Sequence, residues 1–323
     1  MQKHALHSIP FFEQLQSTSK RILLAGMGGG FDIYNGIPLY FSLKEQGYSV
    51  TLANLSFTTL FETTSRPVSA GCYQISQHSE EVSGRNYFPE LYLKQWLTDQ
   101  GETVDVYALE RDGVKPLLDS YNYLIKEHAI DTVLLVDGGT DCLMFGDEQG
   151  LGSPQEDICS LAAAYQSNVD HKYLVSIGFG IDHFHGVSHY RFLENVAKLQ
   201  RDGGYLGLFE LSMLMKEANK FQEAVTYANK KMQKAHSIVA NSIVSALEGQ
   251  YGDYHKTKRT RGSELYINPL MPIYWSFKLD AVVENLKYYD QIKNCRNMKE
   301  FNYGLSDYRV RLEKERESRQ LPI

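Results

Sequence analysis

The chain has 323 residues, 43% hydrophobic and 22% charged, so it is long enough to bury a large core and has an ordinary globular composition. A formal net charge of -6 and a pI near 5.9, with no dominant basic stripe, argue against a general nucleic-acid binder. No apolar run reaches the length of a membrane span, and the first residues lack the apolar segment of a signal peptide. We therefore expect neither nucleic acid nor a membrane as a partner.

Four cysteines are scattered along the chain without a C-x-x-C pair, at positions 72, 142, 159 and 295. This pattern excludes a ribbon-type zinc site and gives no disulfide framework, so it predicts the reducing cytoplasm. We expect a small-molecule ligand as the partner, and the chain length is compatible with a homo-oligomer.

The first half of the chain begins with a predicted lead-in helix over 7–17 and then an apolar strand, a glycine turn and a helix. The strand is 22–25, the turn contains Gly28, Gly29 and Gly30, and Asp32 precedes a helix that extends to residue 46. Glycines allow positive φ angles and a close approach of the backbone, which leaves N–H groups free for a ligand. The stretch predicts a cradle for an anionic or nucleotide-like group, with a plain tight turn as the alternative.

This opening departs from the dinucleotide-binding fingerprint at two places. Phe31 stands where G-x-G-x-x-G requires its third glycine, and the second strand (48–57) ends with Asn54 and Ser56 instead of a ribose-binding acid. We therefore do not expect NAD(P) as a cofactor or dehydrogenase activity.

Further strands are predicted over 104–109, 132–136 and 173–177, with helices over 87–98, 114–128 and 158–165 between them. Residues 58–86 are polar and rich in turns, and we expect them to lie near the site. Five strands that alternate with helices predict an α/β fold, a doubly wound (Rossmann-like) parallel sheet of about five or more strands over residues 1–190.

Residues 191–323 have a different character. Helices are predicted over 191–199, 207–218 and 221–247, an aromatic segment follows, and a last helical stretch starts at 280 and continues into a solvated helical tail of mixed charge. Because no linker separates this part from the first, we interpret it as a mainly helical C-terminal cap packed on the core, with both parts forming one structural unit.

Ligands of doubly wound sheets bind at the carboxyl ends of the strands, and glycine-rich polar segments follow several strands here. After the fourth strand, Asp137 and Asp141 flank a glycine turn, where they could hold a divalent ion, orient a water or bind sugar hydroxyls. Ordinary turn chemistry is the alternative. Glu156 and Asp157 further on are interpreted as part of an acidic loop and a helix N-terminus.

After the fifth strand, Asp182 begins a segment that contains His183, His185 and His189. An H-x-H pair with a third histidine and Asp137 is compatible with a metal centre, and one histidine is equally suited to proton transfer or phosphate contact. The alternative is that these histidines only bond to loop backbone.

The candidate residues form three sets. The catalytic candidates are Asp137, Asp141, Asp182, His185 and His189. The ligand-binding candidates are Gly28, Gly29, Gly30, Asp32, Asn54, Gly138, Gly139, Glu148 and Arg259. The candidate ligands of a divalent metal are His183, His185, His189 and Asp137.

Several stretches resemble a known family: GMGGGFDIYNGIPLYFSL, VTLANLSF, YFPE, LLVDGGTDCLMFGDEQGLGSPQED, IGFGIDHFHGVSHYRFLENVA and RTRGSELYINPLMPIYW. They span roughly residues 8–280, and together they resemble the uncharacterised family called domain of unknown function 1152. The resemblance implies a single unit of conserved length in which these loops belong together. It transfers no catalytic residue.

These patterns favour an enzyme, a hydrolase or group transferase that acts on a small phosphorylated or nucleoside-like ligand at the carboxyl edge of the sheet. One alternative is a metal-dependent hydrolase whose Asp and His residues hold Zn, Mn or Mg. Another is a non-catalytic sensor or scaffold that binds a nucleotide.

Overall fold

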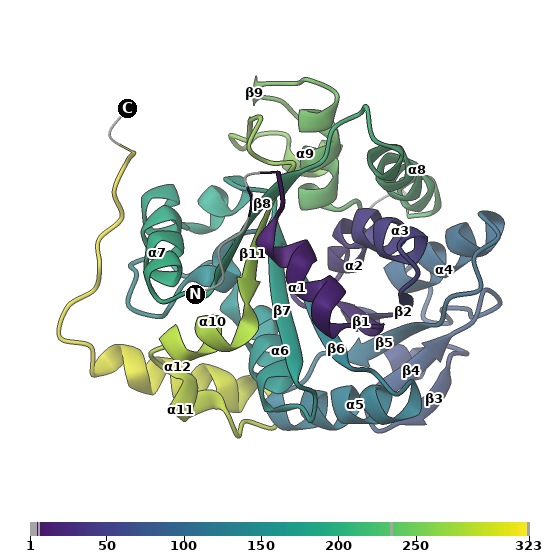
Figure 1. The fold of residues 1–323 in the computed structure, drawn as a ribbon, viewed down its shortest axis with the longest axis horizontal. Helices are drawn as coiled ribbons and strands as arrows, with labels where there is room; N and C mark the ends of the chain where they lie inside the picture. Colours follow the sequence, from purple (N-terminus) through teal and green to yellow (C-terminus); the bar gives the residue numbers. More distant parts are fainter. Residues whose placement is uncertain (1–4, 6, 233–234, 322–323) are drawn as a thin grey trace.

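A large sheet forms the centre of the computed structural model, which describes residues 5, 7–232 and 235–321. Within these residues the sheet has nine strands in the order β3-β4-β5-β2-β1-β6-β7-β11-β8 (Figure 1). Its strands are β1 (Arg21–Gly26), β2 (Ser49–Ser56), β3 (Arg66–Ser69), β4 (Cys72–Ile75), β5 (Val106–Glu110), β6 (Thr132–Gly138), β7 (His171–Ile177), β8 (Tyr205–Glu210) and β11 (Ile273–Lys278). A small separate sheet pairs β9 (Gly252–Asp253) with β10 (Tyr266–Ile267).

The middle of the sheet consists of the five strands predicted from the sequence. β1 pairs in parallel with β2 and β6, β2 with β5, and β6 with β7. The doubly wound α/β fold is therefore confirmed. The chain leaves β1 toward β2 and later returns to β6 on the other side, so the crevice of such folds lies at the carboxyl ends of β1 and β6.

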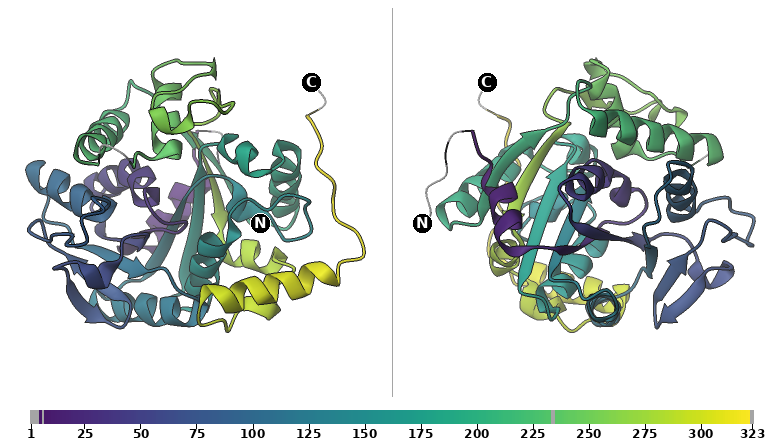
Figure 2. Two further views of the ribbon diagram at one scale, coloured as in Figure 1. Left: turned by 180° about the vertical axis from the view of Figure 1, so that it is seen from behind. Right: turned by 45° about the vertical axis from the view of Figure 1, so that its right-hand side comes forward.

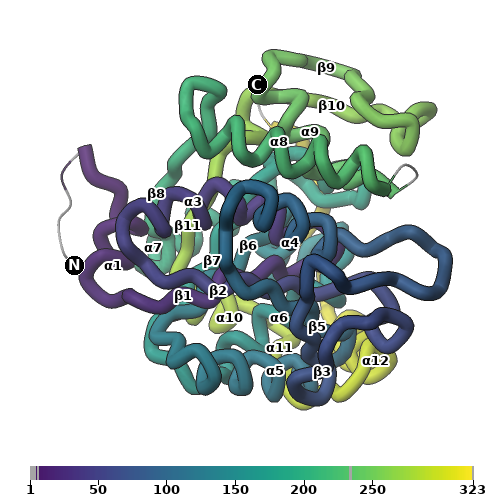
Figure 3. Tube along the Cα trace, turned by 90° about the vertical axis from the view of Figure 1, so that its right-hand side faces the viewer, coloured from purple at the N-terminus to yellow at the C-terminus, as the bar shows by residue number. Residues whose placement is uncertain are grey.

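Helices cover both faces of the sheet. Figure 3 shows α8 and α9 on one side and α5, α6 and α12 on the other. The first face carries α1 (Pro10–Thr18), α2 (Asp32–Asn35), α3 (Ile37–Glu45), α4 (Pro89–Asp99), α8 (Lys216–Lys231) and α9 (Ile238–Leu247). The second carries α5 (Val114–Glu127), α6 (Pro154–Gln166), α7 (His189–Arg201), α10 (Leu279–Asn285), α11 (Tyr289–Ile292) and α12 (Met298–Val310). Among the described residues, no helix combines the length and the hydropathy needed to cross a membrane.

Alternate side chains of the buried strands point into the two cores. In β1, Ile22 and Leu24 pack in the core of the first face, whereas Leu23 and Ala25 pack in that of the second. Because both faces are covered, the strand is apolar at every interior position, as is typical of a parallel sheet.

Two elements of residues 191–323 differ from the prediction, because they are strands of the main sheet. The helix expected over 207–218 is β8, followed by the start of α8 at Lys216, and the helix expected over 221–247 is divided into α8 and α9. The aromatic segment contains β11, which runs antiparallel between β7 and β8. A short apolar run is compatible with a buried strand or a buried helix, and long-range pairing decides between them.

The polar segment 58–86 also contains secondary structure, since η1 (Leu60–Glu62), β3 and β4 lie within it. The C-terminal tail is extended rather than helical after α12 ends at Val310, and it runs past α7 (Figure 2). Backbone bonds hold it there: the Arg316 N–H donates to the carbonyl of Asp147 at 2.7 Å, and the Gln149 N–H donates to the carbonyl of Arg316 at 2.9 Å.

Candidate functional site

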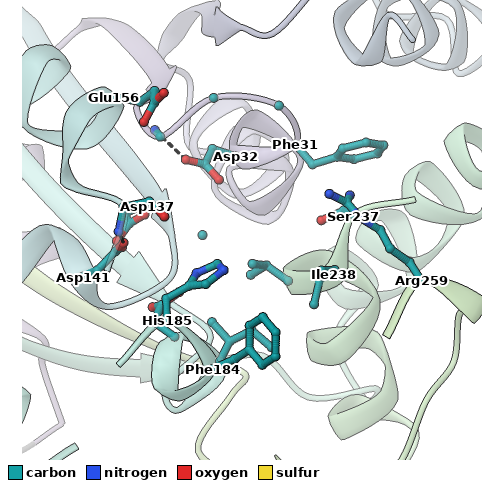
Figure 4. A pocket seen from close by; sticks show the side chains of 18 of the residues that line it. Phe31, Asp32, Asp137, Asp141, Glu156, Phe184, His185, Ser237, Ile238 and Arg259 are labelled. Carbon is teal, nitrogen blue, oxygen red and sulfur yellow. Dashed lines mark hydrogen bonds between the residues drawn. The ribbon is translucent and has the colours of Figure 1, made fainter. Parts of the chain in front are cut away.

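A cavity of about 680 Å³ lies at the carboxyl ends of the parallel strands, within the size range of small-molecule sites (Figure 4). One side, which we call the acidic wall, presents six carboxylates from the sheet side: Asp32, Asp137, Asp141, Glu156, Asp157 and Asp182. The other side, which we call the cap wall, comes from the start of α9 and the segment that follows β9: Ser237, Ile238, Val239, Arg259, Thr260, Ser263, Glu264 and Leu265.

The glycine loop connects β1 to α2 and lines the cavity. Gly29 and Gly30 have φ angles of 93° and 62°, in the left-handed region that glycine adopts without strain. The N–H of Gly28 donates to Oδ2 of Asp32 at 2.6 Å, drawn as the dashed line in Figure 4. The loop therefore holds a carboxylate of the protein itself in place inside the cavity.

Asn54 of β2 supports this loop from beneath. Its Nδ2 donates to the carbonyl of Gly30 at 2.9 Å, and its Oδ1 accepts the N–H of Ile33 at 3.2 Å. The same Nδ2 donates to Glu90 at 2.6 Å, and burial raises the pKa of that carboxyl to about 7. Asn54 is fully buried and is not among the residues that line the cavity, so it shapes the loop instead of facing a ligand.

Three carboxylates of the acidic wall converge. Asp32, Asp137 and Asp157 come from α2, β6 and α6, and one oxygen of each lies within 4.8 Å of the others. All three residues are buried, and among the described residues none of them forms an ion pair with a basic side chain. We call these residues the aspartate trio.

Two buried side chains near the trio have polar atoms without a partner. Asp137 is only 2% exposed, yet its Oδ2 has no hydrogen-bond partner; Asn35 is 1% exposed, and its Oδ1 and Nδ2 have none. A Cβ atom placed on Gly138 would lie within 3 Å of both Asn35 Nδ2 and Asp32 Oδ1. The side-chain amide of Asn35 therefore lies close to the carboxylate of Asp32 in the trio. Because buried polar groups are almost always satisfied, these free atoms point to a ligand.

Burial and mutual repulsion raise the pKa values of the aspartate carboxyls of the acidic wall. Burial raises the pKa of Asp32 to about 7, and burial together with the charges of neighbouring aspartates raises the pKa values of Asp137 and Asp157 well above their ordinary range. Burial also raises the pKa values of Asp141 and Asp182. Raised pKa values of this kind favour the neutral form of each carboxyl.

Asp141 and Asp182 are fixed by backbone donors. Oδ2 of Asp182 accepts the N–H of Thr140 at 2.5 Å, and Oδ2 of Asp141 accepts the N–H of Ser153 at 2.8 Å. His185 ends η3 (Ile181–His185), is exposed and lines the same cavity, and it lies close enough to Asp141 to oppose the rise in the pKa of that carboxyl.

The structure brings ten of the predicted site residues to the cavity: Gly28, Gly29, Gly30, Asp32, Asp137, Gly138, Asp141, Asp182, His185 and Arg259. Gly139 lies behind the wall, where a Cβ would be 2.7 Å from Asp182 Oδ2. Of the histidines proposed as metal ligands, His185 lines the cavity. His183 and His189 stack on each other at 5.2 Å and are not among its lining residues, and burial lowers the pKa of His189.

Glu148 lies outside the cavity in a structural network. Its carboxylate accepts the N–H groups of Phe145 at 3.1 Å and Gly146 at 2.9 Å and pairs with Arg316 of the C-terminal tail. These contacts assign Glu148 to the anchoring of the loop and the tail.

Sequence reasoning underrated Asp157 and missed Ser237 of the cap wall and three aromatic side chains, Phe57, Tyr87 and Phe184. A signal for Asp157 was present, because α6 is the α-helix that connects β6 to β7. In a βα unit the helix begins at the carboxyl edge of the strand, so an acid in its first turn faces the same crevice. For Ser237 no local signal existed.

Comparison with known proteins assigns the chain to a family. The family model described as "Protein of unknown function (DUF1152)" matches residues 23–321. The chain belongs to this family. The resemblance found in its sequence is thereby confirmed, and the match includes both walls of the cavity in this DUF1152 member.

Other comparisons add little to the DUF1152 assignment. A comparison with curated proteins finds no match. Among solved structures, the DUF1152 chain is similar to the zinc-inhibited form of teicoplanin deacetylase Orf2, with 10% identity and a TM-score of 0.37 over 80% of this chain and 98% of that one. A similarity of this extent carries no argument about chemistry.

Proposed function

We propose that this protein is a divalent-cation-dependent enzyme, a hydrolase or group transferase, that acts on a small phosphorylated or nucleoside-like ligand in the cavity. The observation that supports this proposal most strongly is the aspartate trio. One oxygen of each residue lies within 4.8 Å of the others, and Oδ2 of Asp137 has no hydrogen-bond partner. Several buried carboxylates in one place repel each other unless protons or a cation neutralise them. An all-oxygen set is suited to Mg²⁺ or Mn²⁺.

The residues around the trio support this chemistry. The cation would polarise an oxygen of the ligand or lower the pKa of a bound water. His185, next to Asp141 on the same wall, is placed to accept the proton that such a water or hydroxyl releases. Among the described residues, the N–H groups of Gly29 and Gly30 donate to no acceptor, so they are available to an anionic oxygen.

Two alternatives were predicted from the sequence. The first differs from this proposal in its metal site, and the second in having no turnover. A zinc centre with several histidines is less well supported, because His185 is the one histidine among the lining residues that the structure describes. A nucleotide-binding sensor would use the same cavity without turnover.

The four cysteines are buried free thiols, which supports a reducing compartment, and we propose the cytoplasm.

Cation binding and turnover by the full-length protein test this function. The protein is prepared without a histidine tag, treated with EDTA and titrated with Mn²⁺ by calorimetry as wild type, Asp137→Asn and Asp170→Asn. Asp170 is exposed and outside the cavity, so it is the matched control. We expect stoichiometric binding by the wild type and the control, and at least a tenfold weaker affinity in Asp137→Asn.

The same three proteins are then assayed for hydrolysis of phosphomonoesters and nucleotides with Mn²⁺ or EDTA. Turnover that requires Mn²⁺ and disappears in Asp137→Asn supports the enzyme. Nucleotide binding without any turnover would establish the sensor instead. A wild type that binds neither Mn²⁺ nor Mg²⁺ would overturn the proposal.

A further inference from the structure

The cap wall carries a cationic side chain, which the acidic wall lacks. Opposite the six carboxylates, the segment 256–261 contains four basic side chains: Lys256, Lys258, Arg259 and Arg261. Arg259 is the one of these four that lines the cavity, and Figure 4 shows it with Ser237 across from Asp137 and Asp141. A ligand that spans the cavity therefore meets a cationic group at one end and the acidic wall at the other.

The guanidinium of Arg259 has spare capacity for a ligand. Its one hydrogen bond among the described residues goes from NH1 to the carbonyl of His236 at 3.0 Å, and it forms no ion pair with a described carboxylate. Burial raises the pKa of Tyr87, and the charge of Arg259 opposes that rise, which places the guanidinium near the Tyr87 hydroxyl inside the same cavity. The other N–H groups of Arg259 form a fork that suits a tetrahedral anion.

Ser237 supplies a second, independent donor. It is 8% exposed and is the N-cap of the ten-residue helix α9, where its Oγ accepts the N–H of Ala240 at 3.0 Å. Its hydroxyl proton has no acceptor among the described residues, although the side chain is buried and lines the cavity. The first N–H groups of α9, at Ile238 and Val239, lie on the same wall and add the positive end of the helix dipole.

Aromatic rings line the space between the walls. Phe57 and Phe184 line the cavity and are 46% and 65% exposed, although rings of this size are normally covered. Phe31 lines it as well, at 6% exposure. Exposed rings inside a cavity favour a ligand with an apolar or ring-shaped middle part.

We propose that the cap wall binds a phosphate group of the ligand that is separate from the group held at the aspartate trio. The substrate class is a small phosphomonoester in which Arg259 and Ser237 bind the phosphate, the rings cover the middle, and the reacting polar group lies at the cation. The position of the reacting group at the cation rests on the proposed function. Glu264 also lines the cap wall. Like Arg259 it is exposed, so water and salt screen both charges, and the two form no ion pair among the described residues.

Inorganic phosphate is the probe that tests the cap wall. Thermal unfolding of the full-length protein is measured against phosphate concentration at constant ionic strength, once with EDTA and once with Mn²⁺. The variants are Arg259→Gln, Arg259→Lys and the matched control Arg261→Gln, which lies in the same segment but is not among the lining residues. Unfolding without phosphate shows that each variant is folded.

We expect phosphate to stabilise the wild type in EDTA as well as in Mn²⁺. Arg259→Gln should weaken the phosphate affinity at least tenfold, Arg259→Lys by an intermediate factor, and Arg261→Gln by less than twofold, while all three keep the wild-type affinity for Mn²⁺. Loss of Mn²⁺ binding in Asp137→Asn with phosphate binding retained would confirm two separate subsites.

Two results would overturn the cap subsite. One is phosphate binding that needs Mn²⁺ and is unchanged in Arg259→Gln, because the phosphate then sits on the cation. The other is an equal loss in Arg259→Gln and Arg261→Gln, which would mean general attraction by charge. A wild type that binds phosphate through Arg259 but no Mn²⁺ would refute the proposed function and leave the cap subsite standing.

Discussion

The carboxylate of Asp157 lies so close to Gly28 that no side chain fits between them. A Cβ atom on Gly28 would be less than 3 Å from Asp157 Oδ1 and 2.6 Å from Asp32 Oδ2. The absence of a side chain at this position therefore lets an acid from α6 and an acid from α2 meet. The glycine loop serves the aspartate trio as much as it serves a ligand.

Gly28→Ala should lower the affinity for Mn²⁺ at least tenfold, because the added methyl group separates two ligands of the cation. Calorimetric titration measures the effect. Gly47→Ala is the control: Gly47 has a φ of 89° and open space around it, so its substitution costs about 1 kcal/mol in backbone strain without touching the site. Equal Mn²⁺ affinity in wild type and Gly28→Ala would contradict this assignment.

The stability of the cation-free protein should fall as the pH rises from about 4 to about 7. The folded state raises the pKa of Asp32 to about 7, whereas the unfolded chain ionises near the ordinary value of about 3.9, so in this window the folded state holds the additional proton. The free energy of unfolding is measured by urea denaturation in EDTA at pH 5 and pH 8. Asp137→Asn removes a second carboxyl whose pKa burial raises in the folded state, so this variant should lose less stability between the two pH values. Identical losses in the two proteins would contradict the prediction.

Cation binding near pH 6 should release protons. The carboxyls of the trio have raised pKa values, and a divalent cation binds their ionised forms. Calorimetric titrations with Mn²⁺ in two buffers that differ in ionisation enthalpy count the protons, and we expect about one or more per cation. Binding enthalpies that are equal in both buffers would show that the trio is already ionised.

Arg316→Gln should destabilise the protein by about 2 kcal/mol, because it leaves the buried carboxylate of Glu148 without its ion-pair partner. The guanidinium also bonds to Asp147 at 2.8 Å and to Glu194 at 2.5 Å, so it pairs with three acids. Urea denaturation measures the loss.

Arg311→Gln is the matched control for the tail. Arg311 pairs with Asp307 on the surface and is 74% exposed, so its loss should cost less than about 0.5 kcal/mol. A similar cost for both substitutions would mean that the tail contributes nothing specific through Arg316.

Patterns within short stretches of the sequence predicted the centre of the fold and part of the acidic wall. The apolar runs of β1, β2, β5, β6 and β7 are local and bounded by turn residues, and the alternation with helices implied parallel pairing. Asp137 and Asp182 follow directly from this order, since the carboxyl ends of neighbouring parallel strands share one edge.

Contacts between residues far apart in the sequence decided the outer strands of the sheet, the position of the tail and the remaining cavity residues. β8 and β11 are strands because they pair with each other and β11 also pairs with β7. Arg316 is half-buried against acids about 120 to 170 residues earlier in the chain. The sequence by itself determined where polar loops leave the parallel strands. The tertiary structure alone decided that Asp157 completes the trio and that Ser237 and Arg259 face it across one cavity, because side chains so far apart in sequence meet only through the packing of whole elements.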